Sequence, residues 1–283
     1  MKEKVMHVVF AVAALTSILA VALICVFLFA NGLPAILKVG PAAFLGGTTW
    51  KPTASVPQFG ILPMIVGSIY VTAGAIVAGV PVGILTAIFL AFYCPKHLYK
   101  PLKSATELLA GIPSVVYGFF GLVVMVPFIR DNMPGRGLSL LAAAVLLGIM
   151  ILPTIITVAQ SALDAVPKKY YEGALALGAD HERAVFRVIV PAAVSGIMAG
   201  IVLGVGRAIG ETMAVIMVAG NQPAVPGSIF DGVRTMTANI VLEMGYAADL
   251  HRGALVATGV VLFVFILLIT MLFNVIKKRG EMK

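Results

Sequence analysis

Two opposite charges stand in the middle of a long apolar part of this sequence. Arg207 and Glu211 are four residues apart, between an uncharged stretch from Val188 to Gly206 and another from Thr212 to Phe230. A guanidinium is permanently charged and presents a planar fork of donors that matches the oxygens of an oxyanion. A charge inside a membrane costs roughly 2.5–3.5 kcal/mol on insertion scales, so a charged residue at this position is expected to serve a function. The chemistry of Arg207 predicts a path for an oxyanion.

Glu211 has two interpretations. The first is a static ion pair with Arg207 that holds helices together, although Arg before Glu is the weaker order and such pairs contribute only about 0.2–0.5 kcal/mol in water. In the second, Glu211 neutralises Arg207 while no anion is present and lets go when one arrives, so that the anion is held but not trapped. We expect both side chains to line a substrate path.

Three further side chains, Ser114, Tyr117 and Thr212, are second-rank candidates for neutral donors along the same path. Hydroxyl groups in apolar helices more often bond to their own or a neighbouring helix. Gly111 and Pro113 would let the chain bend beside Ser114, as helices that line substrate sites do, but bending for packing alone explains them equally well.

The elements that must position these side chains are membrane-spanning helices. The 283 residues are 60% hydrophobic and 11% charged, with a mean hydropathy of +1.07. An average globular chain is roughly 45–50% apolar and 25% charged, so the composition excludes a soluble domain, a disordered chain and a disulfide scaffold. Cys25 and Cys94 have no partners at redox-motif or metal-ligand spacing and are expected to be small buried hydrophobic residues.

We expect a single all-α transmembrane domain, because crossing a bilayer takes about 20 helical residues and six apolar stretches are long enough. The expected spans are 8–30, 64–93, 107–129, 138–160, 192–219 and 253–276. Outer loops are expected at 31–60, with Trp50 as an interfacial aromatic residue, and at 220–252, where residues 235–244 predict a short helix.

Basic residues gather on one side of the expected spans. Lys96, Lys100, Lys103, Lys168 and Lys169 are among them. By the positive-inside rule this side is cytoplasmic, which gives a topology with both termini inside. The net charge of +8 is then explained without nucleic acid, because basic residues at the ends of spans meet anionic lipid.

A cytoplasmic segment at 161–191 is longer than two adjacent helices need, and its pattern predicts a helix, a turn and a second helix. Pro167 can begin the first helix, Gly178 can end it in a left-handed turn, and Asp180 can cap the next one. Its apolar face needs either a groove in a partner or the bilayer surface to cover it.

This segment resembles the EAA loop of ABC-importer permeases, at that loop's full spacing. The similarity is carried by Glu172, Gly173 and Ala174, then Gly178, then Val188 to Pro191, with Gly173 standing where the family usually has alanine. The resemblance implies that the loop docks on a separate ATPase subunit. The residues it assigns to this coupling role are Tyr171, Glu172, Gly173, Ala174, Gly178 and Pro191. The chain itself has no GxxxxGK[ST] motif.

Further stretches are similar to PstC-type permeases of phosphate importers, from about residue 44 onward. They are Gly47 to Pro52, Phe59 to Pro63, Gly111 to Gly121 and Gly206 to Val215. The sequence from Gly210 to Ala214 is closer to PstC-type than to PstA-type permeases. Residues that match Arg207 and Glu211 are implicated in transport in that family, so the resemblance assigns the pair to the phosphate path.

The resemblance implies a type I ABC importer permease fold in a prokaryotic inner membrane, where the chain would form half of the path of an ATP-driven phosphate importer. The expected partners are a PstA-like permease, two copies of a PstB-like ATPase, a PstS-like phosphate-binding protein and membrane lipid, with no nucleic acid. The chain is expected not to be an enzyme and to bind no metal or cofactor, while the partner ATPase uses ATP and Mg²⁺.

Other functions fit the sequence less well. An intramembrane metalloprotease is disfavoured because His181 and Glu182 are not followed by the second His of an HExxH motif. A stand-alone channel or secondary transporter would explain six spans and an intramembrane pair, but not the long helix-turn-helix segment. The stronger alternative is a permease for a related oxyanion, phosphonate or sulfate, and the motifs above favour phosphate.

Overall fold

The computed structural model of the protein describes residues 2–281, with side chains described for residues 5–273 and for Val275. The first half of the chain forms α1 (Lys2–Val39), α2 (Pro41–Gly46), β1 (Trp50–Lys51), β2 (Gln58–Phe59), α3 (Leu62–Ile88), the π-helical η1 (Phe89–Tyr93), α4 (Lys96–Gly111), α5 (Ser114–Phe120), the π-helical η2 (Gly121–Met125) and α6 (Val126–Asn132). The second half forms α7 (Leu140–Asp164), α8 (Lys168–Ala176), α9 (His181–Ala184), the π-helical η3 (Val185–Ile189), α10 (Val190–Ala192), α11 (Val194–Gly210), α12 (Met213–Val218), α13 (Met236–Met244) and α14 (Asp249–Glu281).

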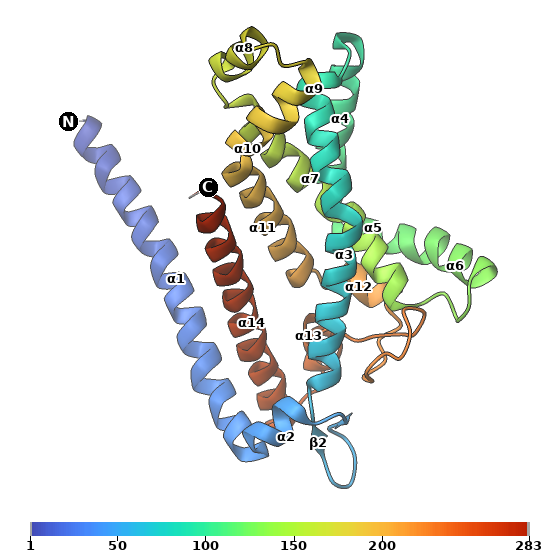
Figure 1. Ribbon diagram of the computed structural model, residues 1–283. Coiled ribbons are helices and arrows are strands. Elements are labelled where there is room, and N and C mark those ends of the chain that lie inside the picture. The colour runs from blue at the N-terminus through green and yellow to red at the C-terminus, as the bar shows by residue number, and fades with distance from the viewer. Residues whose placement is uncertain (1, 282–283) are drawn as a thin grey trace.

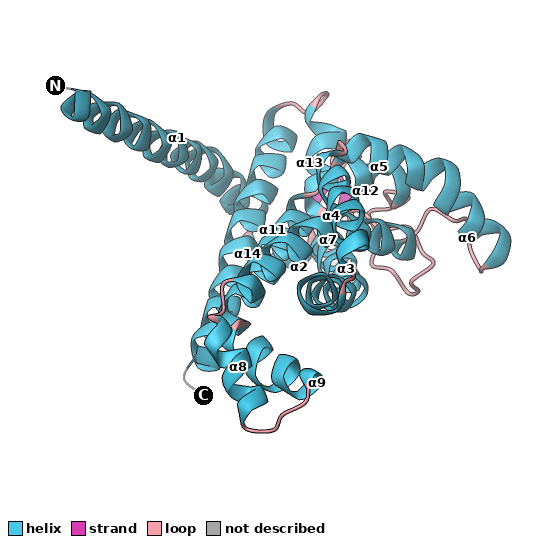
Figure 2. Ribbon diagram, turned by 90° about the horizontal axis from the view of Figure 1, so that it is seen from above, coloured by secondary structure: helices cyan, strands magenta, loops and turns pink. Residues whose placement is uncertain are grey.

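The long helices run between two ends of the molecule (Figure 1). At one end lie α8 and α9, together with the first turns of α1 and the last turns of α14. At the other end lie α2 and the antiparallel hairpin in which Trp50 pairs with Phe59. Seen along the perpendicular direction, α1 stands away from the other helices over most of its length (Figure 2). This arrangement agrees with a topology in which both ends of the chain lie on the side of the basic helix-turn-helix.

Five described helical segments are long and apolar enough to cross a membrane. They are Val5–Val39, Leu62–Tyr93, Ser114–Asn132, Leu140–Asp164 and Asp249–Phe273. The sixth candidate is a bent pair, His181–Ala192 with Val194–Gly210, whose two parts meet at 67°. The protein is therefore an all-α multi-pass membrane protein, as the sequence predicts.

The prediction that an outer loop begins at residue 31 is wrong, because α1 continues to Val39. Gly32 and Pro34 look like helix breakers in the sequence, yet the helix here packs against α14. A Cβ atom on Gly32 would lie 2.6 Å from Cγ2 of Val260, so the glycine permits a close approach of the two helices. The rest of the expected loop contains α2 and the β1–β2 hairpin, and Trp50 is buried, not interfacial.

The prediction of one helix over 107–129 is also wrong, since α4 ends at Gly111 and α5 begins at Ser114. Ile112 precedes Pro113, which disfavours the helical conformation at Ile112, and its ψ is 126°. In Figure 1, α5 and α6 run sideways away from the bundle, while α4 lies near the end of the molecule that holds α8 and α9.

The expected span 192–219 is interrupted at both ends, by the 67° bend after Ala192 and by a break at Glu211 and Thr212. Helix α7 runs to Asp164, so the helix-turn-helix begins later than residue 161. The short helix expected after residue 235 is confirmed: the Thr235 side chain accepts the N–H of Ala238 and caps α13.

Helix α7 is the centre of the bundle and is more buried than the other four unbroken candidate spans. On one side it meets α11, whose glycines recur every four residues. A Cβ atom on Gly196 would lie 2.3 Å from Cβ of Ala162, and one on Gly204 would lie 2.9 Å from Cγ1 of Ile155. Side chains of α7 therefore lie directly against the backbone of α11, as happens between helices in lipid when one of them presents small residues.

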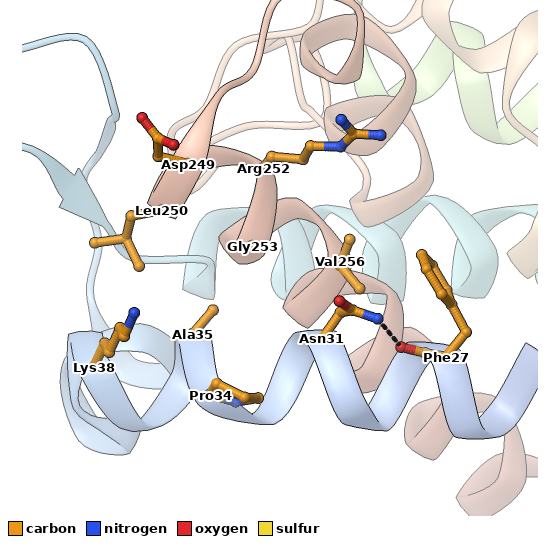
Figure 3. Close-up of a pocket in the computed structure, with 10 residues that line it drawn as sticks. All are labelled: Phe27, Asn31, Pro34, Ala35, Lys38, Asp249, Leu250, Arg252, Gly253 and Val256. Carbon is orange, nitrogen blue, oxygen red and sulfur yellow. Dashed lines mark hydrogen bonds between the residues drawn. The ribbon is translucent and has the colours of Figure 1, made fainter.

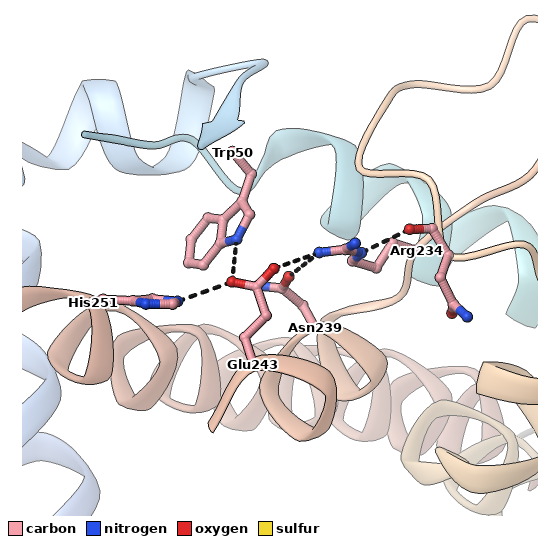
Figure 4. A network of polar contacts seen from close by, with 6 residues as sticks. Trp50, Arg234, Asn239, Glu243 and His251 are labelled. Carbon is pink, nitrogen blue, oxygen red and sulfur yellow. Dashed lines mark hydrogen bonds and ion pairs between the residues drawn. The ribbon is translucent and has the colours of Figure 1, made fainter. Parts of the chain in front are cut away.

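At the end of the molecule that contains the β1–β2 hairpin, a buried carboxylate connects several elements. It belongs to Glu243 on α13, which is 6% exposed (Figure 4). Its Oε2 accepts the indole N–H of Trp50 at 2.8 Å and lies 2.9 Å from Nε2 of His251. Its Oε1 accepts Nη1 of Arg234 at 2.7 Å, and the same Nη1 donates to Oδ1 of Asn239 at 3.1 Å. One carboxylate thus joins the hairpin, the loop before α13 and the start of α14.

Replacing Gly196 by Ala tests the contact between α7 and α11. The added Cβ meets Ala162, so the helices must separate, and we expect a loss of stability of about 1–3 kcal/mol. Gly206→Ala is the matched control, because a Cβ there meets nothing within 4 Å, and we expect a change within about 1 kcal/mol. Thermal unfolding in detergent measures both, and equal midpoints for the two variants would contradict the contact.

Removing the Glu243 carboxylate tests the outer network. Glu243→Ala leaves Arg234, whose side chain is 16% exposed, without its partner, and we expect a loss of about 3–5 kcal/mol. Asp131→Ala is the control, because the Arg130–Asp131 pair is 57% and 61% exposed and contributes about 0–1 kcal/mol. Thermal unfolding measures the loss of stability in both variants. A Glu243 variant as stable as the Asp131 control would show that the network does not stabilise the fold.

Candidate functional site

Arg207 lies in the last turn of α11, where the negative end of the helix dipole favours a cation. The side chain is partly buried, and its Nη1 donates to Oγ1 of Thr154 on α7 at 3.4 Å. This distance is at the long end of the range for a hydrogen bond, so the contact is weak. Within the described residues it is the one hydrogen bond of the guanidinium, which leaves most of its donors for another acceptor.

Glu211 follows Arg207 by four residues but faces the next helix. The backbone at Glu211 is extended, and its Oε1 accepts the N–H groups of Thr212 at 3.1 Å and of Ala214 at 3.2 Å. A carboxylate in this position satisfies donors that the start of α12 would otherwise leave unpaired. Among the side chains described, no ion pair joins Arg207 to Glu211, so neither the static pair nor the neutralising contact expected of Glu211 is formed in this structure.

The three hydroxyl candidates differ in their surroundings. Tyr117 is buried and donates to the carbonyl of Leu109 at 2.8 Å. Thr212 donates to the carbonyl of Gly210 at 3.2 Å, and Ser114 is partly buried at the first position of α5. Two of the three protons are therefore held by backbone carbonyls, and a direct role in a substrate path stays a prediction.

Two neighbouring helices hold the break between α11 and α12 in place. Gly118 of α5 lies against α12, where an added Cβ would lie 2.9 Å from Cα of Ala214. From α13, the hydroxyl of Thr237 donates to the carbonyl of Glu211 at 3.1 Å. The polar break is thus packed against α5 and α13 on one side, while Gly210 and Met213 beside it are exposed.

The cytoplasmic helix-turn-helix has the geometry that its sequence predicts. Gly178 has a φ of +84° after α8, and the Asp180 carboxylate accepts the N–H of Arg183 at 2.7 Å to cap α9. The hydroxyl of Tyr171 lies 2.7 Å from Nδ1 of His181, which in turn packs edge-on against Tyr93 at the end of η1. These contacts fix the orientation of α8 relative to α3.

The tip of this segment exposes apolar side chains. Leu177 is 92% exposed and Leu175 is 41% exposed, whereas Ala174 is buried. Of the remaining residues assigned to coupling, Tyr171 is partly buried, and Glu172, Gly173, Gly178 and Pro191 are exposed. An apolar surface of this kind is typical of a site covered by a partner or by the bilayer surface.

Sequence reasoning missed Thr154, His181 and Tyr93. Thr154 could have been noticed as a hydroxyl inside an apolar run, but its distance of 53 residues from Arg207 hides the contact. His181 was considered only as part of a metalloprotease motif, whereas its ring lies between two tyrosines. The side chains that the structure describes hold no group of three or more His, Cys, Asp or Glu residues placed to bind a metal.

A groove of about 560 Å³ lies away from this site, between α1 and α14 (Figure 3). Its lining includes Phe27, Asn31, Lys38 and Arg252, and the Asn31 amide donates to the carbonyl of Phe27 at 2.8 Å. None of the candidate path residues lines it. The groove and the break beside Arg207 are therefore separate features.

Residues 79–280 match the family described as binding-protein-dependent transport system inner membrane component. Among curated proteins, the probable ABC transporter permease protein YqgH of Bacillus subtilis is 42% identical, over 95% of this chain and 88% of its own length. The phosphate transport system permease protein PstC of Mesorhizobium japonicum is 36% identical, over 94% and 87%. PstC of Haemophilus influenzae is 33% identical, over 93% and 89%.

Solved structures show a similar fold. A bacterial alginate ABC transporter superposes with a TM-score of 0.61 at 17% identity, over 94% of this chain and 94% of that chain. An inward-facing MetNI methionine ABC transporter gives 0.61 at 20% identity, over 77% and 96%. At this level of identity the likeness concerns the fold alone, which is that of ABC importer permeases.

Proposed function

The chain belongs to the family of binding-protein-dependent transport system inner membrane components, as a PstC-type permease, and we propose that Arg207 is the phosphate-binding residue of its translocation path. It is a multi-pass protein of the inner membrane and one permease subunit of an ATP-driven phosphate importer. Its relatives are permease subunits, and this chain catalyses no reaction and binds no cofactor in our proposal.

The observation that carries the proposal is the state of Arg207 at the break between α11 and α12. The guanidinium has one long contact with Thr154, while the nearby carboxylate of Glu211 is occupied by N–H groups of α12. A permanent charge with free donors at a break in a membrane helix supports binding of an oxyanion, because each charge-assisted hydrogen bond to phosphate is stronger than a neutral one.

Glu211 makes the binding reversible. Its negative charge lies four residues from Arg207 and opposes a bound anion, yet its hydrogen bonds to α12 keep it from closing onto the guanidinium. Phosphate is therefore attracted by Arg207 and weakly repelled by Glu211. A single guanidinium does not balance a dianion, so basic residues of a second permease complete the site.

The helix-turn-helix couples this path to ATP hydrolysis on another chain. The exposed Leu175 in the last turn of α8 and Leu177 just after it fit a groove in a PstB-like ATPase dimer, which uses ATP and Mg²⁺. The contacts of Tyr171 and His181 pass a movement of α8 to α3. A PstA-like permease forms the other half of the path, and a PstS-like protein delivers phosphate from outside.

Uptake of labelled phosphate into vesicles that contain the four-component complex tests the role of Arg207. Arg207→Ala removes the charge-assisted bonds, and we expect uptake to fall by about 10- to 100-fold. Glu211→Gln keeps an oxygen for the N–H groups of Thr212 and Ala214 but loses the charge, so a fall in uptake isolates the effect of that charge.

Arg207→Lys is the matched control, because it keeps the charge without the fork and is expected to lie between wild type and Arg207→Ala. Normal uptake in both Arg207→Ala and Glu211→Gln would contradict the assignment. If sulfate or phosphonate competes as strongly as unlabelled phosphate, the result would instead identify that oxyanion as the substrate.

Coupling is tested at Gly178. A Val at a φ of +84° is strained by about 1–3 kcal/mol and must change the turn between α8 and α9, whereas Asn tolerates this conformation. We expect Gly178→Val to insert normally but to lose substrate-stimulated ATP hydrolysis by the complex, and Gly178→Asn to keep most of it. Undiminished stimulation in the Val variant would refute the coupling role.

A further inference from the structure

A stripe of hydroxyl groups continues from Arg207 toward the cytoplasmic end of α7. Thr154, Thr157 and Ser161 are three and four residues apart, so they share one face of the helix. Helix α11 packs on the neighbouring face through Ile155, and the side chains of Thr157 and Ser161 are left exposed. The stripe spans eight residues, whose seven steps of about 1.5 Å make about 10 Å.

The stripe ends in a small cavity, of about 40 Å³, between α4 and α7. Lys103 and Thr106 line it from α4, and Thr157 and Ser161 line it from α7. A second cavity, of about 360 Å³, adjoins it and shares Leu90, Gln160 and Asp164 with it. Lys96 and Lys100 line the second cavity, together with Tyr99 and Cys94.

Lys96, Lys100 and Lys103 all line these two adjoining cavities. They are four and three residues apart on α4 and share one face of that helix. Nζ of Lys103 donates to the hydroxyl of Tyr99 at 3.3 Å, and the Gln160 amide donates to the same hydroxyl at 2.9 Å. The bond to Tyr99 raises the pKa of Lys103.

Two carboxylates face the same cavities. Glu107 lines the first cavity, and Asp164 lines both and lies 3.5 Å from the Gln160 amide. Three ammonium groups against two carboxylates leave a small positive excess. The cavities are also open to water, so an anion is attracted here but not held tightly.

We propose that these two adjoining cavities form a second, weak oxyanion site, through which phosphate leaves Arg207 for the cytoplasm. The site rests on the proposed function for its place in the path. The hydroxyl of Thr157 lies along the way on α7, whereas that of Ser161 donates to the carbonyl of Thr157 at 2.8 Å and offers only its oxygen. Lys100 and Lys103 receive the anion at the inner end. Release follows because Asp164 and Glu107 offset most of the positive charge.

Cys94 reports on the site, because it lines the second cavity and is partly exposed. In a Cys25→Ser background of the full complex in membranes, the rate of modification of Cys94 by an anionic sulfonate thiol reagent is followed by intact mass. We expect inorganic phosphate to slow the modification more than chloride at equal ionic strength. Lys100→Gln and Lys103→Gln should each raise the phosphate concentration for half protection by about two- to fivefold.

Ser104→Ala on the same helix is the control, because Ser104 lines neither cavity, and it should protect like wild type. Equal slowing by chloride, or protection unchanged in both lysine variants, would overturn the site. Protection of Cys94 by phosphate requires neither ATP nor uptake. Loss of protection while uptake still depends on Arg207 would overturn only the second site, and protection without Arg207-dependent uptake would overturn only the proposed role of Arg207. Failure of one proposal is thereby separated from failure of the other.

Discussion

The geometry of the path depends on how closely α7 and α11 approach each other. Gly204 has no side chain, so Ile155 of α7 lies directly against the α11 backbone. In lipid, helices gain little from the hydrophobic effect and associate through close van der Waals contact. This contact therefore fixes the end of α11 on α7 and, with it, the position of Arg207 beside Thr154. A glycine that never meets substrate sets where the guanidinium lies.

The second determinant is the interruption between α11 and α12. A continuous helix would satisfy its own backbone, whereas the break leaves N–H groups at the start of α12 without helical partners. Glu211 accepts two of them, and that role explains why the carboxylate does not pair with Arg207. The charges remain close along the chain yet engage different partners. Attraction and release of an anion can then come from two side chains that act independently.

Local patterns in the sequence were sufficient for some of these features and not for others. The turn at Gly178, the cap at Asp180 and the cap at Thr235 depend on neighbouring residues and could be predicted. The break at Glu211 could not, because hydropathy does not show which donors a carboxylate will find. Trp50 and Glu243 are 193 residues apart, so no spacing could reveal their contact. The path residues themselves came from charge and from family resemblance, and their role in transport stays a prediction.

A structure of the assembled four-component complex with bound phosphate, determined by electron cryomicroscopy, tests the central claim most directly. The account predicts phosphate oxygens at about 2.7–2.9 Å from the guanidinium nitrogens of Arg207, with the Glu211 carboxylate still on the N–H groups of Thr212 and Ala214. Phosphate bound along a path that avoids Arg207, with the guanidinium paired to Glu211, would contradict it.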